Sequence, residues 1–281
     1  MHTLQAIITG SIQGLSEFLP ISSSAHIVFS NELYGLITNT DISNTLNEEE
    51  VFFDIMVHLA TLFAVLIYFF NDLKTIILDF FKSIKTKEYK NENFKLVNYI
   101  ALSTIITGVI GLVLKEKVEN LITNPQIVCI LLFITGIILL FSERMYKGNK
   151  KITLKSAILI SIAQGLAVFP GFSRSGLTIA TGLFQGLDRV QAARFSFLMS
   201  IPIILLASLV YPIIELDFSQ IMTFNFKAII CGFIASFVVG YFCIKYFMRL
   251  LGKLSLRSFA YYCFVASIVM FLLFQFFYHQ Q

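Results

Sequence analysis

Six apolar segments, each long enough to cross a lipid bilayer, dominate this 281-residue chain. A transmembrane helix needs about 20 consecutive apolar residues, because the hydrocarbon core of a bilayer is about 30 Å thick. The segments are 51–70, 96–114, 125–141, 195–214, 228–247 and 258–277. Only 14% of the residues are charged, whereas soluble domains carry about 25%. The sequence therefore predicts an all-α integral membrane protein.

Two further apolar regions, 2–34 and 152–187, are interrupted in the middle. Each consists of two short apolar arms around a polar centre that contains Pro or Gly. The arms are too short to cross a bilayer, so we expect each region to be a re-entrant helix–turn–helix hairpin. Such hairpins are tolerated at membrane depth only where protein or a wet cavity surrounds them. The expected fold is one membrane domain, 1–281, with six spanning helices and two re-entrant hairpins.

The two interrupted regions also carry a repeated motif. Residues 13–25 align without gaps on residues 164–176, and the pairs share Gln, Gly, Leu, Phe and two Ser. A weaker match follows in the next apolar segments. Internal repeats with broken helices are typical of membrane proteins whose sites lie where the broken segments meet. We therefore divide the chain into repeat one, 1–145, and repeat two, 152–281.

The basic residues predict the orientation of this helical bundle. In one orientation, 17 of the 21 Lys and Arg residues fall on the cytoplasmic side, within 74–95, 144–155, 189–194 and 245–257. Cytoplasmic loops carry such an excess of basic residues. The segment 31–50 has no Lys or Arg, so it should be external. The first hairpin then enters from outside and the second from inside, which makes this an inverted-repeat helical bundle with its polar tips near the midplane.

The polar centre of the second hairpin, Gly-Phe-Ser-Arg-Ser-Gly, places Arg174 in sequence that otherwise resembles membrane interior. An arginine in hydrocarbon costs several kcal/mol, so it is rare without an anionic partner or a function. A helix N-terminus offers free N–H donors to phosphate, and a guanidinium offers a planar fork of donors. We therefore predict a phosphate site formed by Arg174, Ser173, Ser175 and Thr178, to which Ser22 of the first hairpin also contributes. The alternative is a structural ion pair between Arg174 and Glu17.

The polar centre of the first hairpin combines an acid, hydroxyls and an imidazole. Glu17 precedes a sharp turn, Ser22 and Ser23 follow it, and His26 is three residues beyond Ser23. A hydroxyl becomes a nucleophile when a neighbouring base removes its proton and a third group orients that base. The pattern predicts Ser23 or Ser22 as nucleophile, His26 as base and Glu17 as its support. In the alternative interpretation, the serines only cap the second arm and His26 bonds to a backbone carbonyl.

A second polar pair, Asp54 and His58, lies four residues apart within the first apolar span. Residues at this spacing share a helix face. The pair is either an interhelical hydrogen-bonding element that orders the bundle, or it supports the predicted site or gives a metal access to it.

These motifs resemble those of a known family. They resemble the two signatures of undecaprenyl-diphosphate phosphatases of the bacitracin-resistance (BacA) type. The first is the run from Gln13 and Glu17 through Phe-Leu-Pro-Ile-Ser-Ser-Ser-Ala to His26. The second is the run Pro-Gly-Phe-Ser-Arg-Ser-Gly around Arg174, followed by Thr178. The likeness extends over nearly the whole chain. The first motif of that family allows Glu or Gln at its first position, and this chain has Gln13, so only Glu17 supplies a carboxylate there.

The resemblance implies hydrolysis of undecaprenyl diphosphate to undecaprenyl phosphate and phosphate, which recycles the lipid carrier of cell-wall synthesis. It also implies a divalent cation, Mg²⁺ or Ca²⁺, for which Glu17 and Gln13 are the candidate ligands. The expected partners are a polyprenyl diphosphate and membrane lipids, with no nucleic acid, and a homodimer is left open. The expected location is the bacterial inner membrane, with the active site facing the periplasm. A lipid-phosphate flippase with the same anion pocket is the rival interpretation.

Overall fold

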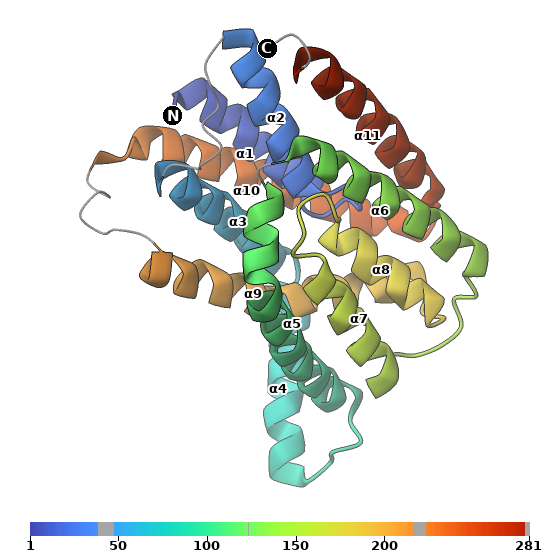
Figure 1. Ribbon diagram of the computed structural model, residues 1–281. Coiled ribbons are helices and arrows are strands. Elements are labelled where there is room, and N and C mark those ends of the chain that lie inside the picture. Colours follow the sequence, from blue (N-terminus) through green and yellow to red (C-terminus); the bar gives the residue numbers. More distant parts are fainter. Residues whose placement is uncertain (39–47, 123, 216–222, 279–281) are drawn as a thin grey trace.

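The computed structural model describes residues 1–38, 48–122, 124–215 and 223–278. All regular secondary structure in these ranges is helical, and Figure 1 shows the helices packed side by side in one bundle. The helices are α1 (Thr3–Ser16), α2 (Ser23–Thr38), α3 (Glu48–Tyr68), α4 (Phe70–Thr86), α5 (Glu92–Ile122), α6 (Pro125–Met145), α7 (Leu154–Leu166), α8 (Arg174–Phe184), α9 (Arg189–Glu215), α10 (Phe226–Leu251) and α11 (Arg257–Tyr278).

The prediction of an all-α membrane protein with six spanning helices is confirmed. Six helices, α3, α5, α6, α9, α10 and α11, are long and apolar enough to cross a bilayer. Large apolar side chains such as Leu112 and Val113 are about three-quarters exposed on their surfaces, at 78% and 72%. Lipid-facing helices expose such side chains because lipid tails are as apolar as leucine.

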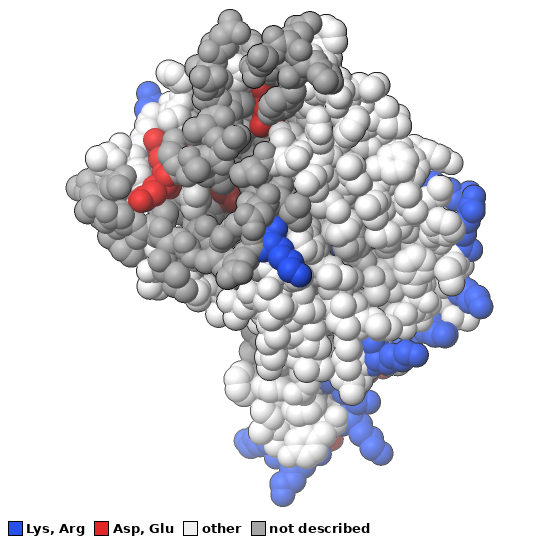
Figure 2. Space-filling model, in the orientation of Figure 1, with Lys and Arg blue, Asp and Glu red and all other residues white. Residues whose placement is uncertain are grey.

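The lysine-rich run 82–95 is typical in sequence of a solvated loop, and that prediction is wrong for its first part, because α4 continues to Thr86 and α5 begins at Glu92. The apolar residues of α4 recur at helical spacing, and this helix packs against α5 through Phe80 and Phe94, whose stacked rings lie 5.3 Å apart. Arg194 of α9 donates two hydrogen bonds to the Asp72 carboxylate, at 2.6 and 2.7 Å. These contacts hold α4 to the bundle at the end where most Lys and Arg residues gather, along the lower and right-hand edges of Figure 2.

Each interrupted region forms a pair of short helices. The pairs are α1 with α2, of 14 and 16 residues, and α7 with α8, of 13 and 11 residues. At 1.5 Å per residue, none reaches the thickness of the hydrocarbon core, about 30 Å. The helix–turn–helix pairs are therefore as expected, while their re-entrant placement in a membrane and the division into two repeats stay predictions.

The tips of the two helix pairs are in direct contact. The Ser175 hydroxyl donates to the Leu19 carbonyl at 3.0 Å, and the Gly171 N–H donates to the Ser24 hydroxyl at 3.2 Å. Because these bonds join residues about 150 positions apart, they bring the two polar motifs of the sequence into one place.

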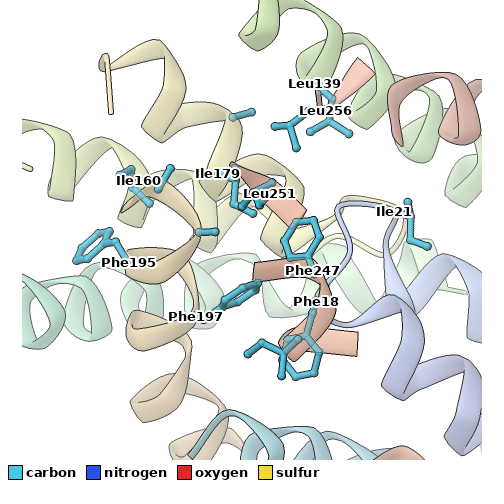
Figure 3. Packing of buried hydrophobic residues seen from close by; sticks show 14 of the residues in the cluster. Phe18, Ile21, Leu139, Ile160, Ile179, Phe195, Phe197, Phe247, Leu251 and Leu256 are labelled. Carbon is cyan, nitrogen blue, oxygen red and sulfur yellow. The ribbon is translucent and has the colours of Figure 1, made fainter. Parts of the chain in front are cut away.

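An aromatic cluster anchors the first tip. Phe18, which directly follows Glu17, is 1% exposed and meets Phe197 of α9 edge to face, with ring centroids 5.5 Å apart. Phe197 in turn contacts Phe247 of α10 at 6.2 Å. Figure 3 shows these rings within the buried core. Each edge-to-face pair contributes about 0.5–1.5 kcal/mol beyond burial, so the cluster fixes the position of the neighbouring carboxylate.

Small residues bring α1 and α10 together. Gly10 and Gly14 of α1 face Gly232, Ser236 and Gly240 of α10, all at four-residue spacing. Small residues at this spacing let two helix backbones approach closely in a membrane protein. A Cβ atom on Gly14 would lie 2.5 Å from the Ser236 carbonyl oxygen and 2.8 Å from the Gly240 nitrogen.

We expect Gly14→Ala to destabilise the fold, because the added methyl group meets backbone atoms that cannot rotate away. Overpacking of this kind costs about 1–3 kcal/mol, which thermal unfolding in detergent would detect as a lower midpoint. Gly111→Ala is the matched control, since a Cβ atom there meets nothing within 4 Å. A Gly14→Ala protein as stable as the Gly111→Ala protein would show that the close approach of α1 and α10 is unimportant.

Candidate functional site

The Glu17 carboxylate lies at the junction of the two tips. It is buried at the C-terminal end of α1, and its Oε1 accepts a hydrogen bond from Arg174 Nη2. Its Oε2 accepts from Gln13 Nε2 at 2.9 Å and from the Ser23 hydroxyl at 2.8 Å. The Arg174–Glu17 ion pair, the alternative that the sequence leaves open, is therefore present. An ion pair removes much of the cost of placing either charge in hydrocarbon.

The ion pair leaves part of the Arg174 side chain unused. Arg174 Nη1 is buried and has no hydrogen-bond partner in the described part of the chain. A guanidinium stays protonated, and a buried donor without an acceptor costs about 1–3 kcal/mol or more when it is charged. The fork geometry of Arg174 suits an anion such as phosphate, which would satisfy Nη1.

The other hydroxyls predicted to bind phosphate already have partners within the protein. Ser173 caps α8 by accepting from the Gly176 N–H at 3.0 Å, and Ser175 donates to the Leu19 carbonyl. Thr178 is fully buried, donates to the Arg174 carbonyl at 2.7 Å and lies 2.6 Å from the Ser196 hydroxyl. Their geometry supports the tip, so Arg174 is the residue of this motif that offers a free donor.

The expected contact between Ser23 and His26 is not formed. Ser23 donates to Glu17, whereas His26 Nδ1 lies 2.8 Å from the Ser22 carbonyl oxygen and His26 Nε2 lies 2.7 Å from the Tyr262 hydroxyl. The alternative in which His26 bonds to a backbone carbonyl is therefore the observed one. Helical side chains tilt toward the N-terminus, which carries the imidazole back to Ser22, while Ser23, at the start of α2, faces Glu17.

The Ser22 backbone forms the turn between α1 and α2. Its φ of 70° is in the left-handed region, which is unusual for a residue with a side chain. The Ser22 hydroxyl accepts from the Ala25 N–H at 3.3 Å and lies 3.1 Å from the Ser24 hydroxyl, and the residue is 2% exposed. Ser22 therefore caps α2, which leaves Ser23 as the serine that faces the carboxylate.

The Asp54–His58 pair adjoins the site. His58 Nδ1 lies 2.9 Å from the Asp54 carbonyl oxygen and 3.6 Å from Asp54 Oδ1. His58 Nε2 lies 3.9 Å from Glu17 Oε2. Of the two roles left open by the sequence, support of the site agrees better with this placement. The signal in the sequence was a polar pair at helical spacing within an apolar span.

The oxygen atoms around Glu17 fit a divalent cation that is shared with a phosphate ligand. Gln13 Oε1 is buried and has no hydrogen-bond partner among the described residues. Carboxylate and amide oxygens are suitable ligands for Mg²⁺ and Ca²⁺, and Mg²⁺ is commonly bound by one or two protein groups plus phosphate oxygens. No group of three or more His, Cys, Asp or Glu side chains that could hold a metal exists within the described ranges. The residues present therefore fit a cation whose ligands come from the substrate as well as from the protein.

An apolar groove of about 890 Å³ lies between α1, α2 and α11. Its walls include Ile8, Ile12, Leu33 and Val265, and the stacked His26 and Tyr262 rings also line it. Because His26 lines the groove and also contacts the Ser22 carbonyl oxygen, the groove lies beside the polar site.

Comparisons with known proteins agree with these motifs. Residues 6–269 match the family described as Bacitracin resistance protein BacA. A protein named undecaprenyl-diphosphatase from Methanobrevibacter smithii is 40% identical over 285 residues, which cover 97% of this chain and 98% of the relative. Proteins of the same name from Methanosphaera stadtmanae and Halothermothrix orenii are 38% and 37% identical, and the alignments cover 96% and 97% of this chain and 97% and 98% of the relatives.

Proposed function

Because the chain belongs to the bacitracin-resistance family BacA, we propose that it is an undecaprenyl-diphosphatase whose hydrolytic site is formed by Glu17, Ser23 and Arg174. The reaction converts undecaprenyl diphosphate to undecaprenyl phosphate and phosphate. The observation that carries the site assignment is the buried Arg174 Nη1, which has no partner among the described residues. Arg174 is also the ion-pair partner of Glu17, the carboxylate that accepts a hydrogen bond from the Ser23 hydroxyl. The names of the relatives indicate hydrolysis, and none indicates lipid translocation.

Arg174 and the N-terminus of α8 would bind the diphosphate. Arg174 Nη1 would donate to a phosphate oxygen, and the positive end of the α8 helix dipole would favour the anion. Ser173, Ser175 and Thr178 hold this helix start in place through their own hydrogen bonds. The diphosphate is thus held at the junction of the two tips, where the Ser23 hydroxyl lies.

Ser23 is the proposed nucleophile and Glu17 the proposed base. As Ser23 Oγ attacks the terminal phosphorus, its proton passes to Glu17 Oε2, the atom to which it is already bonded at 2.8 Å. The bond from the terminal phosphorus to the bridging oxygen breaks, and undecaprenyl phosphate leaves. Water then attacks the phosphoserine, Glu17 returns the proton to Ser23 Oγ, and phosphate leaves. Arg174 stabilises the negative charge that develops on the phosphoryl oxygens.

The cation and the prenyl tail complete this proposal. Glu17 and Gln13 Oε1 would hold Mg²⁺ or Ca²⁺ together with the phosphate, and the cation would neutralise diphosphate charge. The apolar groove beside His26 suits the polyprenyl tail.

The six apolar helices make this a multi-pass membrane protein, and we place it in the bacterial inner membrane with the site facing outside. The basic side chains at one end of the molecule support this orientation (Figure 2). In a cysteine-free background, an impermeant maleimide should label Glu48→Cys in intact cells but not Glu88→Cys. The reverse labelling would place the site at the cytoplasmic face.

Phosphate release by the purified protein tests the proposed function. Undecaprenyl diphosphate should yield phosphate, and undecaprenyl phosphate should yield none. A chelator should stop the release, and added Mg²⁺ or Ca²⁺ should restore it. Release that continues unchanged in chelator would contradict the cation, while the absence of release under all conditions would contradict the hydrolytic function.

A further inference from the structure

Two hydrogen bonds connect α11 to the serine turn at the site. The Tyr262 hydroxyl lies 2.7 Å from His26 Nε2, and His26 Nδ1 lies 2.8 Å from the Ser22 carbonyl oxygen. The Tyr262 and His26 rings are stacked, with centroids 5.6 Å apart and planes inclined by 10°. The imidazole is therefore held at both nitrogens and on one face.

The hydrogen-bond partners determine where the imidazole proton lies. A carbonyl oxygen can only accept, so the Ser22 carbonyl requires a proton on His26 Nδ1. In the neutral ring, Nε2 then carries the lone pair, and the Tyr262 hydroxyl donates to it. Both imidazole nitrogens therefore form hydrogen bonds to groups other than Ser23, and the Ser23 hydroxyl donates to Glu17.

The hydrogen bond from His26 reaches the carbonyl of a residue whose backbone conformation is unfavourable. A left-handed conformation at a residue with a side chain persists only when its surroundings impose it. At Ser22, with its φ of 70°, the His26 imidazole and the His26 N–H both donate to the carbonyl, at 2.8 and 3.3 Å. The peptide bond between Ser22 and Ser23 carries this carbonyl, so fixing it orients the backbone from which the Ser23 side chain extends toward Glu17.

We propose that His26 and Tyr262 are positioning residues for Ser23. Tyr262 orients the imidazole, the imidazole holds the Ser22 carbonyl, and the turn thereby directs the Ser23 hydroxyl toward Glu17. The inference rests on the proposed function of Ser23 and Glu17. It assigns to His26 a role as a hydrogen-bond donor through Nδ1, in place of the proton acceptor that the sequence pattern predicts.

Two amide substitutions of His26 separate these roles. In His26→Asn the side-chain amide can occupy the place of Nδ1 and donate to Ser22, but it cannot take up a proton. In His26→Gln the amide reaches the place of Nε2 instead. We expect His26→Asn to recover most of the turnover lost in His26→Ala, to within about tenfold of wild type, and His26→Gln to recover little. Loss of a general base would lower turnover by about 10²–10⁴-fold in all three variants, and that result would overturn the proposal.

Tyr262→Phe tests the contact between Tyr262 and His26. It removes the hydroxyl and keeps the stacked ring, so we expect kcat to fall by about two- to tenfold, the effect of one hydrogen bond. KM should stay unchanged, because Arg174 still binds the diphosphate. Combined with His26→Ala, the tyrosine substitution should have no further effect, since its partner is already gone. Tyr261→Phe, which removes the exposed neighbouring hydroxyl, is the control.

These outcomes distinguish the inference from the function on which it rests. If the wild-type protein releases no phosphate, the hydrolytic function itself fails. If the wild type is active and Ser23→Ala is inactive, but Tyr262→Phe has the kcat of wild type, only the positioning role of Tyr262 fails. A Tyr262→Phe effect that appears in KM alone would also overturn the proposal and would assign Tyr262 to lipid binding.

Discussion

Arg174→Ala is expected to lose nearly all phosphate release, and Arg174→Lys to lose most of it. Alanine removes both the Nη1 donor proposed to bind the phosphate and the positive charge that pairs with Glu17. Lysine keeps the charge but has a single ammonium, so it cannot contact Glu17 and phosphate through two branches of a fork. Removal of one preorganised donor to a transition state costs about 10²–10³ in kcat, and we expect at least that for lysine. Phosphate release at saturating undecaprenyl diphosphate measures the effect.

The control for Arg174→Lys is the same substitution in a second ion pair. Arg189 donates two hydrogen bonds to the Glu143 carboxylate, at 2.9 and 2.7 Å, at the opposite end of the second helix pair. Arg189→Lys should lower the thermal midpoint and leave kcat unchanged, because the pair joins α6 and α9 away from the hairpin tips. If Arg174→Ala hydrolyses its substrate at the wild-type rate, Arg174 has only the structural role of an ion-pair partner.

The positions of the spanning helices follow from the sequence because the length of each apolar run determines them. A run of about 20 apolar residues is stable in a bilayer only as a helix, whatever its neighbours are. The start of α6 at Pro125 and the six spans therefore agree closely with the prediction. The helix α4 was missed because its lysines suggested a solvated loop, although its apolar residues contact α5.

The sequence predicted which residues form the candidate site, but it predicted only some of the contacts between them. Glu17, Ser23 and Arg174 stand out because polar groups are costly in apolar sequence. Spacing alone placed Ser23 beside His26, since residues three apart share a helix face. Spacing cannot show that Ser23 is the first residue of α2 or that the imidazole turns back toward Ser22. No pattern near Tyr262 pointed to His26, which is 236 residues away and meets it only in the folded chain.

Ser23→Ala is expected to abolish turnover and to preserve binding of the diphosphate lipid. The substitution removes the hydroxyl that donates to Glu17 Oε2 and that attacks phosphorus in the proposed reaction. Arg174 Nη1 and the N-terminus of α8 remain, so the anion site is intact. Phosphate release measures turnover, and protection of the protein against thermal unfolding by undecaprenyl diphosphate measures binding.

Two neighbouring serines serve as matched variants for Ser23→Ala. Ser16 donates to the Ile12 carbonyl within α1, so Ser16→Ala should change neither turnover nor binding. Ser22→Ala removes the cap of α2, which should cost about 1 kcal/mol of stability while turnover persists. Loss of turnover in Ser22→Ala with activity retained in Ser23→Ala would transfer the nucleophile to Ser22. Activity in both variants would mean that water attacks phosphorus directly, and Glu17, as the buried carboxylate next to Arg174, would then be the base for that water.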